Sequence, residues 1–299
     1  MKNRPIRILV DTLRETGGEI QYLEKDGFPP LKITGKRLTG GKIHLNGGVS
    51  SQYLSALMMI APGMEKGLDI FLEGNIISRP YIEMTRRLMQ IFGVETHWEG
   101  ANIRIEPQNY RAVPFTIESD WSAASYWYEI RALSQGKAKI ELPGLTTDSL
   151  QGDSKCAELF KQIGSSTEIQ YDFVNQPDLA QTFIVTCCLM DIPFQFTGLQ
   201  SLRIKETDRI AALQTELKKL GYLITNQFDH TLEWKGERCE PEPNPVIETY
   251  EDHRMAMAFA PACLKTGRIK INNPQVVSKS YPGFWKDLEK AGFSIDIEL

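Results

Sequence analysis

Four segments of the chain place ionisable or hydroxyl side chains at the start of a predicted helix. They are Gly47–Gln52 (GGVSSQ), Lys205–Arg209 (KETDR), Tyr250–Arg254 (YEDHR) and Ser278–Pro282 (SKSYP). A helix N-terminus presents unpaired N–H groups and a partial positive charge, so it attracts phosphate or carboxylate. Arginine adds a planar fork of donors that binds such groups in pairs. If the N-termini of these helices (their entrances) lie close together, they would therefore form a cleft for a small molecule with several negative charges.

Taken singly, each segment also has an ordinary structural explanation. Ser50 is typical of a helix N-cap, Lys205–Arg209 of a solvated helix start, and Lys279 of a polar surface loop. For Tyr250–Arg254 the two interpretations weigh equally, because a run of ionisable groups beside an apolar helix should face a cleft rather than a core. The shared position of all four segments, at helix entrances, favours one common site.

Two sequence patterns recur and alternate along the chain. The first is an amphipathic helix, a glycine and a short strand-like run, with copies at 9–20, 82–96, 156–169, 210–224 and 284–297. The second is an apolar helix, a turn and an alternating strand, with copies at 50–72, 121–142, 178–196 and 252–271. Helices that are apolar around most of their circumference, such as 53–60 and 255–262, are expected inside a domain. These repeats predict about four and a half α+β units, with strands at 137–142 and 268–271.

Composition excludes several classes of function. The 299 residues are 41% hydrophobic and 24% charged, with a net charge of −4, so neither disorder nor a nucleic-acid-binding surface is indicated. The five cysteines and four histidines show no metal-binding spacing, and the odd cysteine count argues against a disulfide framework. With no secretory signal predicted and no apolar run long enough to span a bilayer, we expect a cytoplasmic protein.

Several motifs taken together resemble the EPSP synthase family (3-phosphoshikimate 1-carboxyvinyltransferase). They are Ser50-Ser51-Gln52-Tyr53, Ser78-Arg79-Pro80-Tyr81-Ile82, Pro177-Asp178, Lys205–Arg209, Asp252-His253-Arg254-Met255-Ala256 and Lys279-Ser280-Tyr281-Pro282. The resemblance implies an α/β (α+β) enolpyruvyl transferase-like fold with two domains, each built of three βαβαββ units. Residues 1–117 would then be an incomplete first domain, on the shikimate 3-phosphate side, and residues 118–299 a nearly complete second domain.

The resemblance also implies which residues hold the two substrates. Those matched to shikimate 3-phosphate are Ser50, Ser51, Gln52, Ser78, Tyr81, Asp178 and Lys205. Those matched to phosphoenolpyruvate are Gln52, Arg209, Arg254 and Lys279. Ser201 departs from the pattern, because it stands where the family usually has an asparagine that touches shikimate 3-phosphate.

Three of the matched positions, Asp178, Glu206 and Lys205, are catalytic in the family. The resemblance implies that Asp178 takes the proton of the substrate's 5-hydroxyl as it attacks carbon 2 of phosphoenolpyruvate, and that Glu206 protonates the methylene carbon. A tetrahedral intermediate then loses phosphate. The family needs no metal, flavin or nucleotide, and a monomer is its usual state.

The resemblance places further family residues upstream of Met1, including a lysine and an arginine that hold phosphoenolpyruvate. On this basis we expect a truncated chain that alone shows no measurable phosphate release, since losing several such contacts removes most charge stabilisation. Two alternatives stay open at this point. One is the related transferase acting on UDP-N-acetylglucosamine, and the other is a non-catalytic fragment that needs a separate N-terminal piece.

Overall fold

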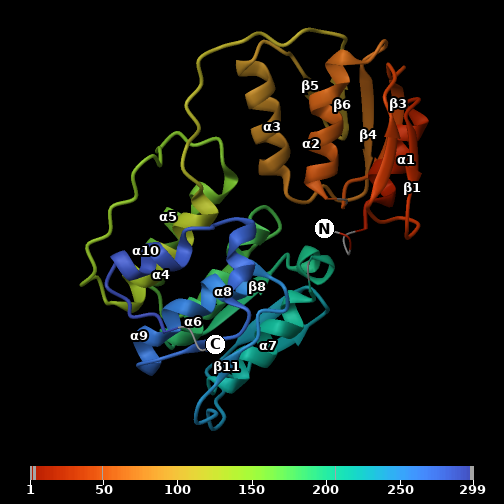
Figure 1. The fold of residues 1–299 in the computed structure, drawn as a ribbon. Helices are drawn as coiled ribbons and strands as arrows, with labels where there is room; N and C mark the ends of the chain where they lie inside the picture. The colour runs from red at the N-terminus through yellow and green to blue at the C-terminus, as the bar shows by residue number, and fades with distance from the viewer. Residues whose placement is uncertain (1, 3–4, 49, 206, 297–299) are drawn as a thin grey trace. The chain divides into compact units, whose positions relative to one another are not determined.

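The structure, a computed structural model, describes residues 2, 5–48, 50–205 and 207–296 (Figure 1). Its contacts divide the chain into two compact units. Unit 1 contains Met1–Glu118 and Asp148–Gly152, and unit 2 contains Ser119–Thr147 and Asp153–Leu299. The chain thus passes from unit 1 to unit 2 after Glu118, and a short later segment returns to unit 1.

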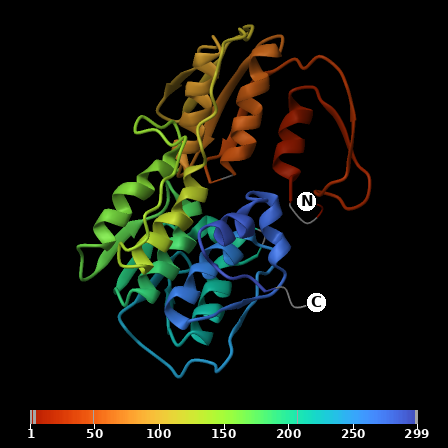
Figure 2. The same cartoon turned by 60° about the vertical axis from the view of Figure 1, so that its left-hand side comes forward.

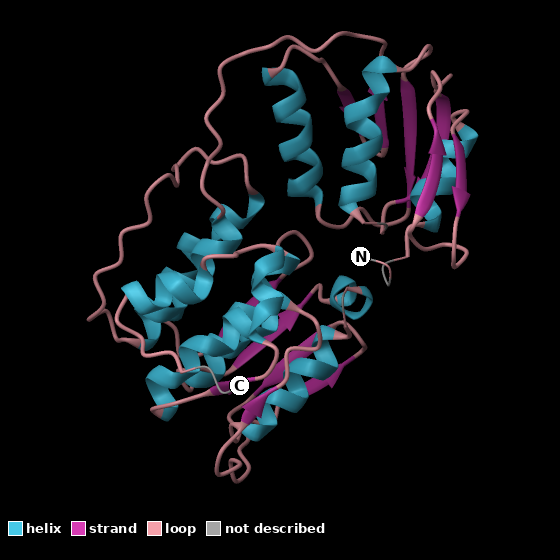
Figure 3. Cartoon of the chain, in the orientation of Figure 1, coloured by secondary structure: helices cyan, strands magenta, loops and turns pink. Residues whose placement is uncertain are grey.

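Unit 1 contains three helices and six strands among its described residues. In chain order they are α1 (Arg7–Glu15), β1 (Glu19–Tyr22), β2 (Leu31–Thr34), β3 (Gly41–Asn46), α2 (Ser51–Ile60), β4 (Leu68–Glu73), α3 (Arg79–Ile91), β5 (His97–Glu99) and β6 (Asn102–Ile105). β1 and β2 form an antiparallel pair, and the other four strands form one sheet in the order β3-β4-β6-β5. Figures 1 and 2 show α2 and α3 running side by side, and Figure 3 shows them on one face of this sheet.

The parallel pair β3 and β4 decides where the helices of unit 1 begin. Two parallel strands end at the same edge of a sheet, so the helices that follow them start at that edge. The core between sheet and helices is aliphatic, because each strand turns alternate side chains inward, as Ile43 and Leu45 do in β3. The entrances of α2 and α3, which carry the predicted site residues of this unit, are therefore brought together.

Unit 2 contains seven helices and six strands among its described residues. In chain order they are α4 (Trp121–Leu133), α5 (Cys156–Ile163), β7 (Ile169–Asp172), α6 (Ala180–Leu189), β8 (Phe194–Thr197), α7 (Arg209–Lys219), β9 (Thr225–Gln227), β10 (Thr231–Trp234), β11 (Val246–Ile247), α8 (His253–Phe259), α9 (Cys263–Thr266), β12 (Lys270–Ile271) and α10 (Phe284–Lys290). One sheet has the order β7-β8-β10-β9, and β11 and β12 form a parallel pair.

The two four-stranded sheets share one topology, which confirms the predicted repeat. From β3 to β6 and from β7 to β10 the chain runs βαβαββ, with the first two strands parallel and the other pairings antiparallel. In both sheets the fourth strand lies between the second and the third. As a consequence, α6 and α7 also begin at one common edge of their sheet.

The predicted burial of the apolar helices is right in unit 2 and wrong for α2. All ten residues of α6 are buried, as are six of the seven residues of α8. In α2 only Leu54, Leu57 and Met58 are buried, and Met59 is 50% exposed. α2 packs against α3 and contributes its buried residues to the core of unit 1, but Met59 and Ile60 on its other side stay 50% and 43% exposed.

Two predicted strands are absent or shortened. The predicted strand 137–142 lies in neither a helix nor a strand, and of the predicted strand 268–271 only Lys270 and Ile271 form β12. A strand exists only where a neighbour pairs with its backbone. Instead of pairing, the carbonyl of Ile140 accepts a hydrogen bond from the Arg131 guanidinium in α4. Alternation predicted which side chains turn inward, as Ile140 and Leu142 do, but not whether a partner strand is present.

Glycines end most of the amphipathic helices as predicted. Gly93 after α3 and Gly221 after α7 have φ of +84° and +91°, a conformation that other residues reach only with strain. Gly164 after α5 is different, because its φ is −70° and any residue could adopt it. No helix in the described ranges has both the length and the apolar character needed to cross a membrane.

Glu129 in α4 is a fully buried carboxyl group in the helical core of unit 2. Neither of its carboxyl oxygens has a hydrogen-bond partner among the described residues. Burial raises its pKa well above the ordinary value, and the nearby Thr186 hydroxyl opposes this shift only in part. The folded protein therefore holds this proton more tightly than the unfolded chain does.

Because of this raised pKa, Glu129 should lower the stability of the protein as the pH rises. The loss of folding free energy is absent at pH values below the pKa that Glu129 has in the unfolded chain. It grows with pH until the pH exceeds the pKa that Glu129 has in the folded protein. We expect Glu129→Gln to unfold in urea like the wild type near pH 4 but at higher urea concentration at pH 9. Equal midpoints at both values would show that Glu129 is solvated or paired.

Candidate active site

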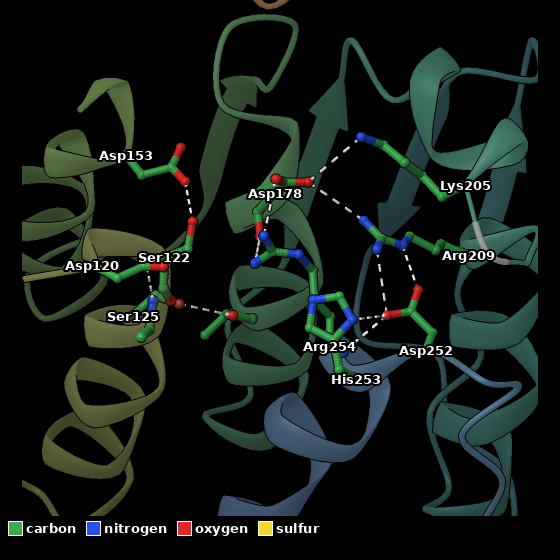
Figure 4. Close-up of polar contacts among 12 residues, drawn as sticks. Asp120, Ser122, Ser125, Asp153, Asp178, Lys205, Arg209, Asp252, His253 and Arg254 are labelled. Carbon is green, nitrogen blue, oxygen red and sulfur yellow. Dashed lines mark hydrogen bonds and ion pairs between the residues drawn. The ribbon is translucent and has the colours of Figure 1, made fainter. Parts of the chain in front are cut away.

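The entrances of α6, α7 and α8 bring four predicted site residues together in unit 2 (Figure 4). Asp178 lies in the one-turn 3-10 helix Pro177–Leu179 that leads into α6. Lys205 follows the 3-10 helix Gln200–Ile204, Arg209 is the first residue of α7, and Arg254 is the second residue of α8. Since α6 packs against both α7 and α8, the three entrances meet.

Asp178 is in contact with three of the predicted cations. Its Oδ2 lies 2.9 Å from Arg254 Nη2, and its Oδ1 lies 3.5 Å from Arg209 Nη1 and 3.7 Å from Lys205 Nζ. Arg254 Nη1 also donates to the carbonyl oxygen of Asp178 at 3.1 Å and to the Tyr126 hydroxyl at 3.4 Å. The guanidinium of Arg254 is thus oriented by three acceptors, two of them on Asp178 at the start of α6 and one on Tyr126 in α4.

These contacts control the protonation of Asp178. Burial by itself would raise the pKa of the carboxyl group, but the positive charges of Arg254, Lys205 and Arg209 together outweigh burial and hold the pKa well below its ordinary value. Asp178 is therefore ionised at neutral pH. Any anion that binds to the same cations competes with this carboxylate.

Asp252 is a second carboxylate of the cluster, and it holds Arg209 in place. It is fully buried, and its Oδ2 accepts from Arg209 Nε at 2.5 Å while its Oδ1 accepts from Nη2 at 3.3 Å. The same Oδ1 accepts from the backbone N–H of Arg254 at 2.8 Å, which caps α8. One buried carboxylate therefore fixes both arginines, one through its side chain and the other through its backbone.

His253 is buried beside Asp252 and is neutral at physiological pH. Burial and the neighbouring Arg254 lower its pKa to about 4, against the weaker opposing effect of Asp252. Its Nδ1 has no hydrogen-bond partner within the part of the chain that the structure describes. The positive charge of the site therefore comes from arginine and lysine rather than from this histidine.

The loop that carries Lys205 is held by Arg203. Its Nη1 donates to Asp208 Oδ2 at 2.6 Å, and its Nε donates to the carbonyl of Asp229 in the β9–β10 turn at 2.9 Å. Asp208 in turn caps α7 by accepting from the backbone N–H groups of Ile210 and Ala211. The chain on either side of Lys205 is thereby tied to the helix that begins with Arg209.

The remaining predicted residues of unit 2 are placed less centrally. Lys279 is exposed at the end of the 3-10 helix Pro274–Lys279, which packs against α8. Ser201 is half-buried in the 3-10 helix before Lys205. Glu206, the predicted general acid, lies outside the described residues.

The predicted residues of unit 1 sit at the adjacent entrances of α2 and α3. Ser50 occupies the N-cap position of α2, which begins with Ser51 and Gln52, but its side chain makes no capping hydrogen bond. Ser78 precedes α3 in a left-handed conformation, φ +55°, and is buried, with Tyr81 one turn later. These hydroxyl and amide groups belong to unit 1, whereas the cations belong to unit 2.

Sequence reasoning missed Asp252 and Asp208 as site-forming residues, although both lie inside the motifs. Asp208 directly precedes α7 and Asp252 directly precedes α8, and an aspartate at a helix start is the sequence signal of an N-cap. Asp120 shows the same signal before α4, where it accepts from the N–H of Ala123 at 3.0 Å (Figure 4). Tyr126 and Arg203 carry no comparable signal, because only the tertiary structure brings them to the cluster.

The fold is that of enolpyruvyl transferases. The structure aligns over 100% of its length with EPSP synthase from Acinetobacter baumannii, covering 73% of that chain with a TM-score of 0.72 at 22% identity. It aligns over 98% of its length with the enolpyruvyl transferase NikO from Streptomyces tendae, covering 72% of that chain with a TM-score of 0.65 at 15% identity. At these low sequence identities, the structural similarity establishes the fold and nothing further.

Sequence comparison defines the family. The family description "EPSP synthase (3-phosphoshikimate 1-carboxyvinyltransferase)" matches residues 1–288. A 3-phosphoshikimate 1-carboxyvinyltransferase of Bacteroides fragilis is 56% identical over 99% of this chain and 77% of its own length. One of Haemophilus influenzae is 34% identical over 97% of this chain and 70% of its own length. The chain belongs to the EPSP synthase family, and the UDP-N-acetylglucosamine alternative is not favoured.

Proposed function

We propose that the residues of this site serve the transfer of the enolpyruvyl group of phosphoenolpyruvate to the 5-hydroxyl of shikimate 3-phosphate, with release of phosphate. The observation that carries this proposal is the contact of Asp178 with Arg254, Arg209 and Lys205, because these cations suit ligands rich in phosphate and carboxylate. Family membership supports the choice of substrates. Residues 1–117 and 118–299 are proposed as the two substrate-binding domains of such an enzyme.

The binding roles follow from charge and donor type. We assign the carboxylate and phosphate of phosphoenolpyruvate to Arg209 and Arg254, together with Gln52 and Lys279. Shikimate 3-phosphate is assigned to Lys205 and Asp178 and to the hydroxyl and amide groups at the helix entrances of unit 1. Those last residues are Ser50, Ser51, Gln52, Ser78 and Tyr81.

The same cations regulate the proposed proton transfer. While they contact Asp178, its pKa is too low for an effective base at neutral pH. Each negative charge that binds to Arg209, Arg254 or Lys205 cancels part of their effect, so substrate binding raises the pKa of Asp178. The carboxylate then takes the proton of the 5-hydroxyl as that oxygen bonds to carbon 2 of phosphoenolpyruvate. The methylene carbon gains a proton, from Glu206 in this proposal, and becomes a methyl group. In the second step that methyl group loses a proton as phosphate leaves, which restores the carbon–carbon double bond of the transferred enolpyruvyl group.

Ligand binding tests this assignment without depending on turnover. Calorimetric titration with shikimate 3-phosphate and then phosphoenolpyruvate is expected to show saturable binding of both. UDP-N-acetylglucosamine serves as the control ligand and is expected not to bind. Lys205→Met, which removes one positive charge, should weaken shikimate 3-phosphate binding about tenfold or more. Binding of the nucleotide sugar in place of shikimate 3-phosphate, or of none of the three ligands, would contradict the proposal.

We also propose a monomeric protein of the cytoplasm. All five cysteines are free thiols, which supports a reducing compartment. Sedimentation at several concentrations tests the monomer, and a mass that rises with concentration would speak against it.

A further inference from the structure

Residues 246–252 run antiparallel to α7 and are bonded to it at successive points. In chain order the bonds are Lys219 Nζ to the carbonyl of Val246 (2.8 Å), the N–H of Glu248 to Glu216 Oε2 (3.1 Å), the Tyr250 hydroxyl to Glu216 Oε1 (2.7 Å), and Arg209 Nε to Asp252 Oδ2 (2.5 Å). The last of these bonds belongs to the site, and the others lie further along the helix. The segment is therefore held to α7 from its first residue to the site.

Glu216 is the main anchor of this segment. Its side chain is fully buried, and it accepts hydrogen bonds from the Tyr250 hydroxyl, the N–H of Glu248 and Lys219 Nζ, the last at 2.7 Å. A buried carboxylate is tolerated only with such partners. Glu216 follows Arg209 by seven residues, or about two helical turns, so both lie on the same face of α7. One helix face thus carries the anchor and the arginine of the site.

The chain between the anchor and the site has a strained backbone. Tyr250 and Glu251 both have positive φ, +53° and +58°, a conformation that residues with side chains rarely adopt. The turn is closed by the N–H of Asp252, which donates to the carbonyl of Thr249 at 2.8 Å. Such strain persists only where surrounding contacts impose it. The hydrogen bond from the Tyr250 hydroxyl to Glu216 and one from Asn273 Nδ2 to the Glu251 carboxylate, 3.0 Å long, are contacts of this kind.

We propose that Tyr250 and Glu216 are positioning residues for Arg209 and Arg254. The bond between the Tyr250 hydroxyl and the Glu216 carboxylate braces the strained turn, and the turn sets the place of Asp252. Asp252 then holds the Arg209 side chain and caps the helix that carries Arg254. Neither positioning residue needs to touch a substrate. The inference rests on the proposed function in one respect, which is that the two arginines bind phosphoenolpyruvate.

The test removes one oxygen atom. Tyr250→Phe keeps the ring and loses the hydroxyl, so the turn should relax and the arginines should lose their alignment. We expect phosphoenolpyruvate to bind about tenfold more weakly in the presence of shikimate 3-phosphate. We also expect faster hydrogen–deuterium exchange at residues 250–254. Tyr110→Phe is the matched control, because the Tyr110 hydroxyl donates to the Met59 carbonyl of unit 1 at 2.8 Å and should leave both readouts unchanged.

A double-mutant cycle separates this role from a general loss of stability. Methionine has a length similar to that of glutamate but no oxygen to accept the Tyr250 hydroxyl. Glu216→Met combined with Tyr250→Phe should therefore weaken phosphoenolpyruvate binding little more than the larger single effect, because both changes break the bond between Tyr250 and Glu216. Wild-type binding and wild-type exchange in Tyr250→Phe would overturn the inference, as would fully additive effects in the cycle. If the wild type binds neither substrate, the proposed function fails, and the exchange comparison still decides whether Tyr250 braces the turn.

Discussion

The Asp252→Ala variant is expected to unfold at a much lower urea concentration than the wild-type protein. The substitution leaves the Arg209 guanidinium, which is 2% exposed, without the two hydrogen bonds it donates to Asp252. Removing one partner of a buried ion pair costs about 3–5 kcal/mol, and loss of a helix N-cap adds about 1 kcal/mol. The free energy of unfolding, measured by urea titration at neutral pH, should fall by an amount of this order.

Asp252→Asn is the matched control for this prediction. Asparagine can still cap α8 and accept a hydrogen bond from Arg209, but it carries no charge. Its stability should therefore lie between those of the wild type and the alanine variant. If Asp252→Ala lost less than about 1 kcal/mol, Asp178 would be sufficient to compensate the Arg209 charge, and Asp252 would not be needed to hold it.

The convergence of the cations was predictable because it follows from local signals and from repetition. Polar segments at the entrances of apolar helices, recurring at equivalent places, predict neighbouring helix N-termini. The parallel pairs β3–β4 and β7–β8 supply the physical reason, since helices that follow parallel strands begin at one edge. Lys205, Arg209 and Arg254 were placed together on this basis, and all three contact Asp178.

The carboxylates that hold these cations were less predictable. The Arg209–Asp252 pair joins residues 43 positions apart, and the hydrogen bond from Arg254 to Tyr126 spans 128 positions. Such contacts depend on how helices pack, which spacing along the chain does not encode. The positive φ of Tyr250 and Glu251 is still harder to foresee, because turn signals rely on glycine or asparagine at such positions. Non-local pairing also explains the missing strand at 137–142, where alternation was present and a partner strand was not.

Asp178→Asn is expected to tighten the binding of inorganic phosphate while it weakens the fold at neutral pH. In the wild type the Asp178 carboxylate competes with anions for Arg254, Arg209 and Lys205. Removing its charge leaves three cations facing one another with one fewer negative charge between them. Phosphate titrated calorimetrically into the variant should therefore bind about tenfold more tightly than into the wild type. For the same reason the variant should unfold at lower urea concentration.

The stability difference between Asp178→Asn and the wild type should depend on pH in a defined direction. The pKa of Asp178 in the folded protein lies below its ordinary value of 3.8, so the stability that it contributes is present above pH 3.8 and is lost as the pH falls toward the folded pKa. The difference is therefore largest at neutral pH and shrinks in acid. Asp172→Asn is the control, because Asp172 is an exposed carboxylate of unit 2 whose Oδ1 accepts from the N–H of Val174, which asparagine can also do. A stability difference that stayed constant from pH 7 to pH 3, or unchanged phosphate affinity, would mean that Asp178 does not share its cations with bound anions.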